Sequence, residues 1–294
     1  MFFLKRFMFF SCNFAPIIII KMKTFRSIPY TLNLGGHLFT LGRPLVMGIL
    51  NVTSESFYEA SQTHTAEAIA QRARAIIHEG GDIIDIGACS TKPGLEPISE
   101  EEEMSRLAFA LPIIRSVAPE ALLSVDTFRA TIAKRCVEEY GVHIINDISS
   151  GKMDPQMFDT VAELNVPYIL THNGEGAWKD VAFDLAQSIS RLRVMGVNDI
   201  IVDPGFGFGK TLDENYRLMA HLEEFHILKS PLLVGISRKS MIYKELDSTP
   251  EEALNGTTTL NTIALMKGAH ILRVHDVREA VEAVKIVEKL NGIN

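Results

Sequence analysis

Eight short apolar segments alternate with eight amphipathic ones along the chain, and this alternation restricts the fold more than any other feature. The apolar runs predict strands at residues 45–50, 83–86, 122–125, 143–145, 168–170, 200–202, 232–234 and 269–272. Most are apolar throughout, which is typical of strands covered on both faces in a parallel sheet. The segments between them have apolar residues at helical spacing and predict helices at residues 65–78, 99–116, 128–140, 155–164, 181–195, 214–226, 251–266 and 277–290.

Eight strand–helix pairs within about 250 residues predict an α/β fold of the (β/α)8 type, a TIM barrel. The alternative, a doubly wound open sheet, usually carries a glycine-rich loop after its first strand. Here the first predicted strand ends in Asn51-Val52-Thr53 and the glycine-rich loop follows the sixth, so the barrel is favoured. Residues 24–42, with Gly35-Gly36 near the middle, predict a short β-hairpin that leads into the barrel.

The N-terminus is set apart from the barrel by its composition. After Lys5-Arg6 comes an apolar stretch of about 14 residues, shorter than the roughly 20 that span a membrane, and no small-residue cleavage site follows it. We interpret residues 1–23 as an N-terminal extension that is disordered, is associated with a surface, or precedes a true start at Met22. Residues 24–294 are expected to form a single domain.

Charge and cysteine content exclude several classes of protein. The formal net charge is −7, so no overall basic field attracts nucleic acid. We expect neither a nucleic-acid partner nor a membrane partner. The three cysteines are widely spaced, which suits a reduced cytoplasmic protein better than a disulfide or zinc framework. Cys89, near the end of the second strand, is interpreted as a packed small residue.

Every predicted strand ends in polar residues. The ends are Asn51; Ser90-Thr91-Lys92; Asp126; Asn146-Asp147; Thr171-His172-Asn173; Asp203 with Lys210; Ser237-Arg238-Lys239-Ser240; and Arg273 with His275. Any single one of them could cap a helix or occupy a turn. In a barrel of this type, however, the carboxyl ends of all strands meet at one face, which carries the active site. Eight polar ends therefore predict one site at the mouth of the barrel.

The sixth of these ends, Asp-Pro-Gly-Phe-Gly-Phe-Gly-Lys at residues 203–210, is the most distinctive. A buried strand ends there in an acid, three glycines and a lysine. We expect a corner that offers a carboxylate, exposed backbone N–H groups and a cation. Such a corner can hold a polar heterocycle by its edge.

One group of strand ends predicts anion binding, namely Thr91, Arg273 and His275. Asn51 can add an amide oxygen for a hard cation. Because Mg2+ commonly takes few protein ligands and relies on substrate phosphates, one Asn suffices if a diphosphate completes the coordination shell.

A second group predicts recognition of the edge of a ring. Its members alternate acceptors and donors, as an aminopyrimidinone requires: Asp126, Asn146, Asp203 and Lys239. A buried carboxylate that faces an N–C–N edge can accept two charge-assisted hydrogen bonds. No nucleophile paired with a base accompanies either group.

Seven motifs closely resemble those of the dihydropteroate synthase family. They are Met47-Gly48-Ile49-Leu50-Asn51-Val52-Thr53, Asp82-Ile83-Ile84-Asp85-Ile86-Gly87, Ser124-Val125-Asp126-Thr127, Ile145-Asn146-Asp147, the run at residues 203–210, Gly235-Ile236-Ser237-Arg238-Lys239-Ser240 and Arg273-Val274-His275-Asp276. The resemblance covers the chain from near residue 40 to near residue 290, with the motifs in the same order. It implies an enzyme of folate biosynthesis that condenses 6-hydroxymethyl-7,8-dihydropterin diphosphate with 4-aminobenzoate, giving 7,8-dihydropteroate and diphosphate. Mg2+ as cofactor and a homodimer are also implied.

The resemblance assigns roles by position in these motifs. The pterin would be held by Asp126, Asn146, Asp203 and Lys239. The diphosphate and its Mg2+ would be held by Asn51, Thr91, Arg273 and His275. Phe208 and Ser240 would line the aminobenzoate site, and Lys92 and Gly235 are further substrate-binding residues. Catalytic roles are expected for Glu55, Thr91, Lys239, Arg273 and His275.

The chain departs from the family pattern mainly in its loops. Glu55 stands where the family has Asp, and Glu59-Ala60-Ser61 replaces Asp-Gly-Gly, which stiffens the first loop. Lys92 replaces Arg and loses its planar fork. Thr171-His172-Asn173 replaces Met-His-Met. Two alternatives stay open: a catalytically impaired pterin-binding paralogue, which these loop changes favour, and a pterin-dependent methyltransferase, against which Thr91, Arg273 and His275 argue.

Overall fold

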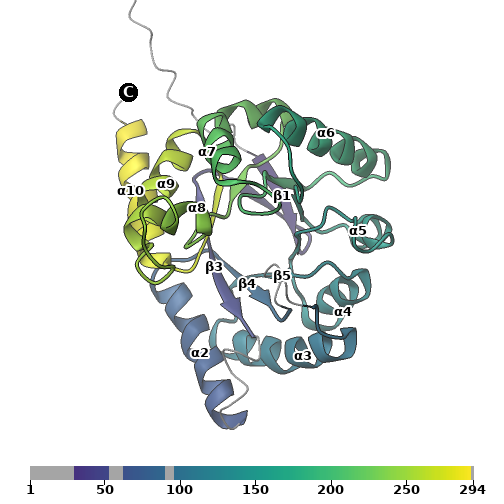
Figure 1. Ribbon diagram of the computed structural model, residues 1–294. Coiled ribbons are helices and arrows are strands. Elements are labelled where there is room, and N and C mark those ends of the chain that lie inside the picture. The colour runs from purple at the N-terminus through teal and green to yellow at the C-terminus, as the bar shows by residue number, and fades with distance from the viewer. Residues whose placement is uncertain (1–29, 53–61, 90–95, 293–294) are drawn as a thin grey trace, which may run out of the picture.

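The computed structural model of the chain describes residues 30–52, 62–89 and 96–292 (Figure 1). Its central sheet has eight parallel strands: β3 (Leu45–Asn51), β4 (Ile83–Gly87), β5 (Leu122–Asp126), β6 (Ile144–Asp147), β7 (Tyr168–Thr171), β8 (Ile200–Asp203), β9 (Leu233–Val234) and β10 (Ile271–Val274). Their order is β8-β7-β6-β5-β4-β3-β10-β9, and a parallel bridge between Val202 and Leu232 joins the two edge strands. The sheet is thus a nearly closed barrel, which confirms the predicted fold class.

Helices surround the barrel (Figure 1). They are α2 (Gln62–His78), α3 (Glu100–Val117), α4 (Ala130–Tyr140), α5 (Met157–Leu164), α6 (Trp178–Val194), α7 (Leu212–Ala220), α9 (Leu254–Met266) and α10 (Val277–Asn291), with a short α8 (Ser240–Tyr243) and the 3-10 helix η1 (Leu222–Leu228). Ser99 caps α3, because its Oγ accepts from the backbone N–H of Glu102 at 3.2 Å. The glutamates in the first turn also stabilise this end of the helix, since their negative charge interacts favourably with the helix dipole.

The predicted helix at residues 214–226 was wrong in its length. The chain forms α7 and then the tighter η1, and the two meet at His221. The ring of His221 stacks on Trp178 of α6, with 4.7 Å between centroids and 19° between planes. This contact between two helices is not visible in the periodicity of either segment.

The predicted hairpin closes the amino-terminal end of the barrel. Strands β1 (Tyr30–Leu34) and β2 (His37–Leu41) pair antiparallel across Gly35 and Gly36, whose φ angles of 61° and 87° are those of a type I′ turn. Leucines of the hairpin pack on the inward-facing residues of the barrel strands. The resulting cluster contains Leu32, Leu34, Leu41, Leu45, Met47, Ile83, Ile144, Ile169, Ile201, Leu233 and Ile271.

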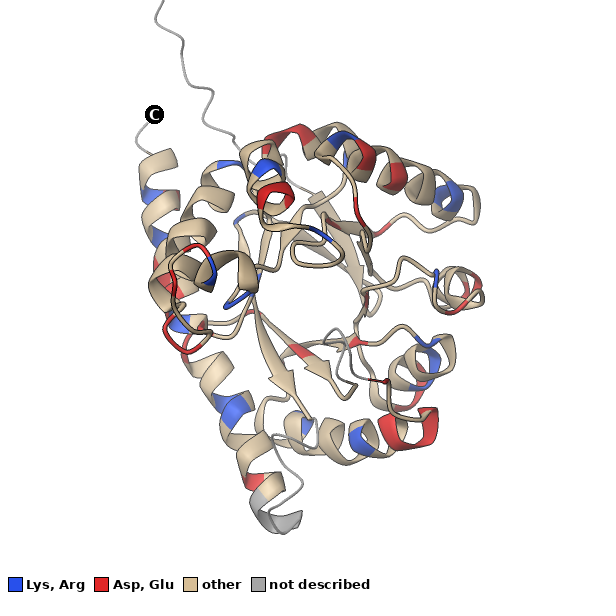
Figure 2. Cartoon of the chain, viewed as in Figure 1, with Lys and Arg blue, Asp and Glu red and all other residues tan. Residues whose placement is uncertain are grey.

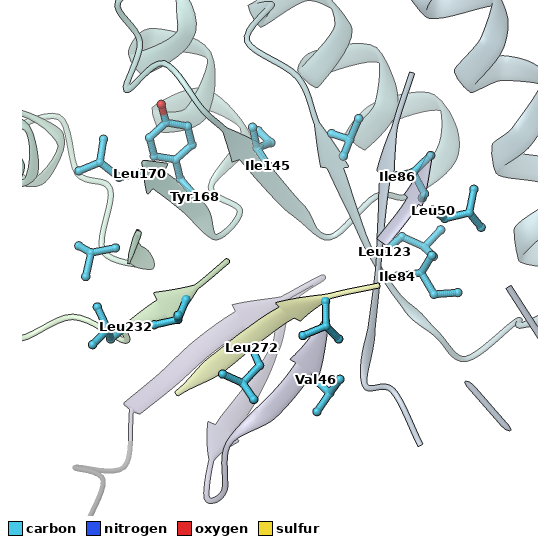
Figure 3. Packing of buried hydrophobic residues seen from close by; sticks show 14 of the residues in the cluster. Val46, Leu50, Ile84, Ile86, Leu123, Ile145, Tyr168, Leu170, Leu232 and Leu272 are labelled. Atoms are coloured by element: carbon cyan, nitrogen blue, oxygen red, sulfur yellow. The ribbon is translucent and has the colours of Figure 1, made fainter. Parts of the chain in front are cut away.

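Side chains alternate between the two faces of each strand. Those that face outward pack against the helices, and Figure 3 shows part of this layer, including Val46, Ile84 and Leu272. Those that face inward are apolar near the hairpin and polar two residues further along each strand. At that second level lie Asp85, Ser124, Asn146, Thr171, Asp203 and Arg273, all buried or half-buried. The period of two thus places polar groups at the carboxyl ends of the strands.

Within the described residues, none of the helices combines the length and the apolar character needed to cross a membrane. Charged residues lie mainly on the outer helices, but both signs also occur on the elements that line the central ring (Figure 2).

Candidate active site

The mouth of the barrel is organised around the guanidinium of Arg273, on β10. Its Nε donates to Asp85 Oδ2 at 2.6 Å, and its Nη2 donates to Asp126 Oδ2 at 2.5 Å. The same Asp85 oxygen accepts from Asn146 Nδ2 at 3.0 Å. Strands β4, β5, β6 and β10 therefore bring four polar side chains into one hydrogen-bonded group. Arg273 Nη1 has no partner within the described residues, so it can take an additional acceptor.

Two acids share the charge of this one arginine. Burial raises the pKa of Asp126 to about 7, Arg273 pulls it down, and Asp85 adds to the rise. Arg273 donates only to Oδ2 of Asp126 among the described residues. The structure brings Asp126 and Arg273 into direct contact, although the sequence predicts ring recognition for the first and anion binding for the second.

Asp203 and Lys239 form the opposite side of the mouth. Asp203, at the end of β8, is buried, and its Oδ1 accepts from the backbone N–H of Gly205 at 2.8 Å. Lys239 Nζ donates to the carbonyl of Phe206 and lies 4.4 Å from the ring centroid of Phe208. Burial lowers the pKa of Lys239 to about 8, while the same cause raises the pKa of Asp203. The Lys239 charge lowers the pKa of Asp203, and the Asp203 charge raises the pKa of Lys239, so each group partly offsets the effect of burial on the other.

The loop at residues 203–210 differs from the corner predicted for it. Lys210 Nζ was expected to face a ligand, but it contacts His172 Nδ1 at 3.1 Å and donates to the carbonyls of Gly205 and Phe208 at 2.9 and 3.2 Å. The N–H of Gly207 donates to Asn215 Oδ1 at 2.7 Å. These groups stabilise the loop because its tight turns leave carbonyls that need donors. Of the predicted corner, the Asp203 carboxylate remains for recognition.

Two glycines keep space open at the mouth. A Cβ on Gly235 would lie 3.7 Å from both Asp203 Oδ2 and Arg273 Cβ. A Cβ on Gly87 would lie 3.3 Å from Asn51 Oδ1 and 3.6 Å from the Cβ of Asp126. A side chain at either position would therefore enter the space between the polar groups. Gly235 thus lies beside Asp203 and Arg273, two of the other predicted substrate-binding residues.

Asn51 is exposed at the end of β3, and His275 is exposed just beyond β10. His275 Nδ1 lies 3.1 Å from Ser237 Oγ, which also accepts from the backbone N–H of His275 at 3.1 Å. Arg72, on α2, donates to the carbonyls of Ile49 and His275 at 3.1 and 2.7 Å. These contacts fix the backbone on which the two exposed side chains stand.

The remaining predicted residues fall into two groups. Phe208 is beside Lys239, and Ser240 begins α8 directly after it, so both lie next to the pair of Asp203 and Lys239. Glu55, Thr91 and Lys92 lie outside the described residues.

Sequence reasoning missed the part that Asp85 plays. Asp85 lies within one of the seven motifs but is not among the predicted site residues, although an acid inside the apolar run of residues 83–86 is itself a signal. Asp147 has a structural use, since its carboxylate accepts from Tyr168 Oη at 2.6 Å and from the N–H groups of Ser149 and Gly151 at 2.7 Å each.

No group of three His, Cys, Asp or Glu side chains that could hold a metal ion occurs in residues 30–52, 62–89 and 96–292. The donors at the mouth nevertheless fit a Mg2+ ion that arrives with a phosphate ligand. Asn51 offers one exposed amide oxygen, and phosphate oxygens can supply others.

Comparisons with known proteins show the family to which the chain is similar. The model of a family described as pterin binding enzyme matches residues 47–275. The dihydropteroate synthase of Escherichia coli K12 is 39% identical over 269 residues, which are 86% of this chain and 94% of that protein. The Bacillus subtilis enzyme of the same name is 40% identical over 257 residues, or 84% and 89% of the two chains.

Solved structures of dihydropteroate synthases are also similar to this chain. The Xanthomonas albilineans dihydropteroate synthase with 4-aminobenzoic acid superposes with a TM-score of 0.81 at 34% identity, covering 90% of this chain and 99% of that one. The Yersinia pestis enzyme in complex with a sulfonamide drug superposes with a TM-score of 0.79 at 37% identity, covering 90% and 100%.

Proposed function

The chain belongs to the family of pterin-binding enzymes and is a dihydropteroate synthase, and from this premise we propose that the mouth of its barrel has a pterin side and a leaving-group side. On the pterin side, the carboxylates of Asp203 and Asp126 accept from the edge of the ring, the Asn146 amide can both accept and donate, and Lys239 supplies a further donor. Burial supports this assignment, because a buried carboxylate without hydrogen-bond donors is costly, and a ligand that donates two hydrogen bonds to it binds more tightly. Gly235 leaves room for the flat ring.

The leaving-group side is proposed to consist of Arg273 and His275, with Thr91 from the second loop. Its main support is that Arg273 Nη1 has no partner among the described residues, while Nε and Nη2 are both held by acids. A guanidinium fixed in this way presents its remaining N–H groups to an anion without reorganisation. We propose that Mg2+ binds with the diphosphate through Asn51, and that it supplies additional positive charge there.

The reaction breaks the C–O bond between the pterin methylene and the diphosphate. The diphosphate leaves with the electron pair of that bond, and the aromatic amine forms the new C–N bond and then loses a proton. Negative charge grows on the leaving group as this bond breaks, so Arg273 stabilises the transition state more than the ground state. An uncharged aromatic amine is a nucleophile near neutral pH, which is why no nucleophile–base pair is needed.

The second substrate, 4-aminobenzoate, is proposed to bind beside Phe208 and Ser240, next to Lys239. Two loop residues, Lys92 and Glu55, are proposed to complete this site, Glu55 with its negative charge near the developing cationic carbon. Lys239 Nζ above the Phe208 ring supports this position, because it offers both an aromatic face and a cation to a flat carboxylate ligand.

The single observation that carries these roles is the group of Arg273, Asp126, Asp85 and Asn146 at one end of the barrel. The experiment that tests the activity measures diphosphate release from pterin diphosphate and Mg2+, with and without 4-aminobenzoate. We expect release that depends on the amine and yields dihydropteroate. Tight binding of the pterin diphosphate without amine-dependent release would instead identify an impaired paralogue. Chelation of Mg2+ should abolish release.

We further propose a homodimer that forms through α9 and α10. These helices pack against each other and expose apolar side chains, namely Ile263, Met266, Ile286 and Leu290. Light scattering should report twice the chain mass for the wild type and a lower mass for Met266→Glu. Exposed Phe183→Glu, on α6, is the control. A cytoplasmic location is proposed as well, supported by the wide spacing of the three cysteines in the sequence, which suits a reduced protein better than a disulfide framework.

A further inference from the structure

Asp85 contacts two functional residues but is placed too deep to be the first group that a substrate meets. It lies in β4 with an exposed fraction of 0%. Its Oδ2 accepts from both Arg273 Nε, at 2.6 Å, and Asn146 Nδ2, at 3.0 Å. Its Oδ1 is buried and has no hydrogen-bond partner within the described residues. A single carboxylate oxygen therefore joins the proposed pterin side to the proposed leaving-group side.

We propose that Asp85 is a positioning residue that orients Asn146 toward the pterin and Arg273 toward the diphosphate at the same time. The inference rests on the roles proposed above for those two residues. It assigns to Asp85 no contact with substrate. What it adds is that the two halves of the site share one support, so that a change at Asp85 is felt by both.

The orientation of Asn146 follows from the chemistry of the carboxylate. An ionised carboxylate only accepts hydrogen bonds, so the amide must turn its NH2 group toward Asp85. Asn146 Oδ1 then points elsewhere and can accept from a ligand, and the second N–H of Nδ2 is left to donate. Without Asp85 the amide could flip, and it would then present the wrong group to the ring.

The orientation of Arg273 follows from the two-point contact. Asp85 holds Nε and Asp126 holds Nη2, and two fixed points define the plane of a guanidinium. The direction in which Nη1 points is then fixed by these two hydrogen bonds, and the side chain does not sample other rotamers. Loss of the Asp85 contact leaves a single anchor, about which the guanidinium can swing.

Stability alone does not account for this acid. A carboxylate buried at 0% exposure carries a large desolvation cost, and an apolar side chain of similar volume is often as stable or more stable in such a place. The level of the barrel just below is apolar, with Ile83 on the same strand. The neighbouring strand offers a natural control in Ser124, which pairs with Asp85 in register and whose Oγ has no partner within the described residues.

The test measures two binding constants by calorimetry, one for 6-hydroxymethylpterin and one for inorganic diphosphate with Mg2+. Asn146→Ala should weaken only the pterin, and Arg273→Ala should weaken mainly the diphosphate. Asp85→Ala should weaken both, each by about tenfold, the usual effect of losing one charge-assisted contact. Asp85→Asn keeps an acceptor oxygen of the same shape but loses the charge and adds a donor, so it should restore only part of each affinity. Ser124→Ala should change neither.

Double variants separate positioning from a general packing effect. If Asp85 acts on the pterin through Asn146, the pair Asp85→Ala with Asn146→Ala should bind pterin no worse than Asn146→Ala alone. The equivalent result is expected for diphosphate with Arg273→Ala. Should Asp85→Ala not fold, Asp85→Ser replaces it in the same cycles, with the same expected pattern.

Additive losses in the two cycles, or weakening of one probe only, would overturn the inference. So would a Ser124→Ala variant that weakens both probes as Asp85→Ala does. These outcomes are distinct from failure of the proposed function, which would appear as unchanged affinities in the single variants Asn146→Ala and Arg273→Ala.

Discussion

At the scale of the residue, Asp203 is the acid whose contribution is easiest to isolate, because it is buried and its partners are few. Its Oδ1 is held by the N–H of Gly205 and its Oδ2 faces Gly235. We expect Asp203→Asn to weaken binding of 6-hydroxymethylpterin by roughly ten- to a hundredfold, because hydrogen bonds to a charged group contribute roughly 1.5–3 kcal/mol. Calorimetry measures the change, with the exposed Asp213→Asn as control. Unchanged affinity would remove Asp203 from the pterin side.

Gly235 tests the shape of the same pocket. An added methyl group would lie no closer than 3.7 Å to its neighbours, and its φ angle is not in the left-handed region, so Gly235→Ala should fold normally. The methyl group nevertheless occupies the space between Asp203 and Arg273. We expect pterin affinity to fall about tenfold, the effect of overpacking by one methyl group. Gly42→Ala, with nothing within 4 Å, is the control for affinity and for melting temperature. Equal affinities would place the ring elsewhere.

The polar residues of the mouth could be predicted because each follows an apolar run, and the structure confirms their convergence through the contacts of Asp126, Asn146 and Arg273. Their pairing could not be predicted, since it depends on which strands are neighbours and how deep each side chain lies. Lys210 was misjudged for the same reason. Its partner His172 is on a different strand end, 38 positions earlier in the chain.

At the scale of the element, the loop at residues 203–210 is held in shape by glycines. Gly205 has a φ of +75°, and a Cβ there would lie 1.8 Å from the carbonyl oxygen of His172. Both the strained backbone and the clash with rigid main chain oppose any side chain. We expect Gly205→Ala to lower the free energy of unfolding by more than about 3 kcal/mol, within the range of severe single substitutions, and to weaken pterin binding as well.

The turn glycine Gly36 is the matched control for this prediction. Its φ is +87°, but no atom lies within 4 Å of an added Cβ. Gly36→Ala therefore shows only the cost of the backbone conformation, of the order of 1–2 kcal/mol. Urea unfolding of both variants compares them directly. Similar losses in the two would mean that the loop yields and that the contact with His172 is not rigid.

The strands and helices were predictable as elements because their hydrophobic periods differ. All the strands except β9 extend at least one residue beyond the predicted apolar run, so that Asn51, Asp126 and Asp203 are still within β3, β5 and β8. Apolar runs alone could not reveal this, since hydrogen bonds with the next strand continue after the last apolar residue. The four-residue α8 was not predicted, because one turn has no measurable period.

At the scale of the whole molecule, the inward faces of the strands divide into an apolar level and a polar one. The apolar level is closed by the hairpin, and the polar level opens at the mouth. Residues that stabilise the fold therefore lie mainly toward the hairpin, and residues that could bind a ligand lie mainly toward the mouth. Substitutions near the hairpin should therefore affect unfolding without affecting ligand binding.

His270 joins three parts of the molecule at the closed end of the barrel. Its Nδ1 accepts from the backbone N–H of Leu232 at 3.1 Å, and its ring meets those of Tyr30 in the hairpin and His226 in η1 at 5.1 and 5.7 Å. Burial lowers the pKa of His270 to about 4, with a further contribution from His226. The folded protein thus holds this imidazole neutral at a pH where an unfolded chain protonates it.

The sign of the pH effect follows from this difference. Between pH 6.5 and 4 the unfolded chain binds a proton at His270 that the folded chain does not, so the free energy of unfolding falls as the pH falls. One pKa unit corresponds to about 1.4 kcal/mol, which predicts a loss of about 2 kcal/mol between pH 6.5 and pH 5 from this residue. His270→Asn keeps an acceptor for Leu232 N–H and removes the titration.

Urea unfolding at pH 7 and pH 5 of the wild type, of His270→Asn and of the exposed His37→Asn tests this directly. Other groups titrate in all three proteins, His172 among them, whose pKa burial also lowers to about 4. Their contribution cancels when the losses are compared. The wild type and His37→Asn should lose about 2 kcal/mol more than His270→Asn on acidification. Equal losses in all three proteins would mean that the closed end of the barrel admits the proton without opening. Pterin affinity at pH 7 should be the same in all three, since the hairpin end is separate from the mouth.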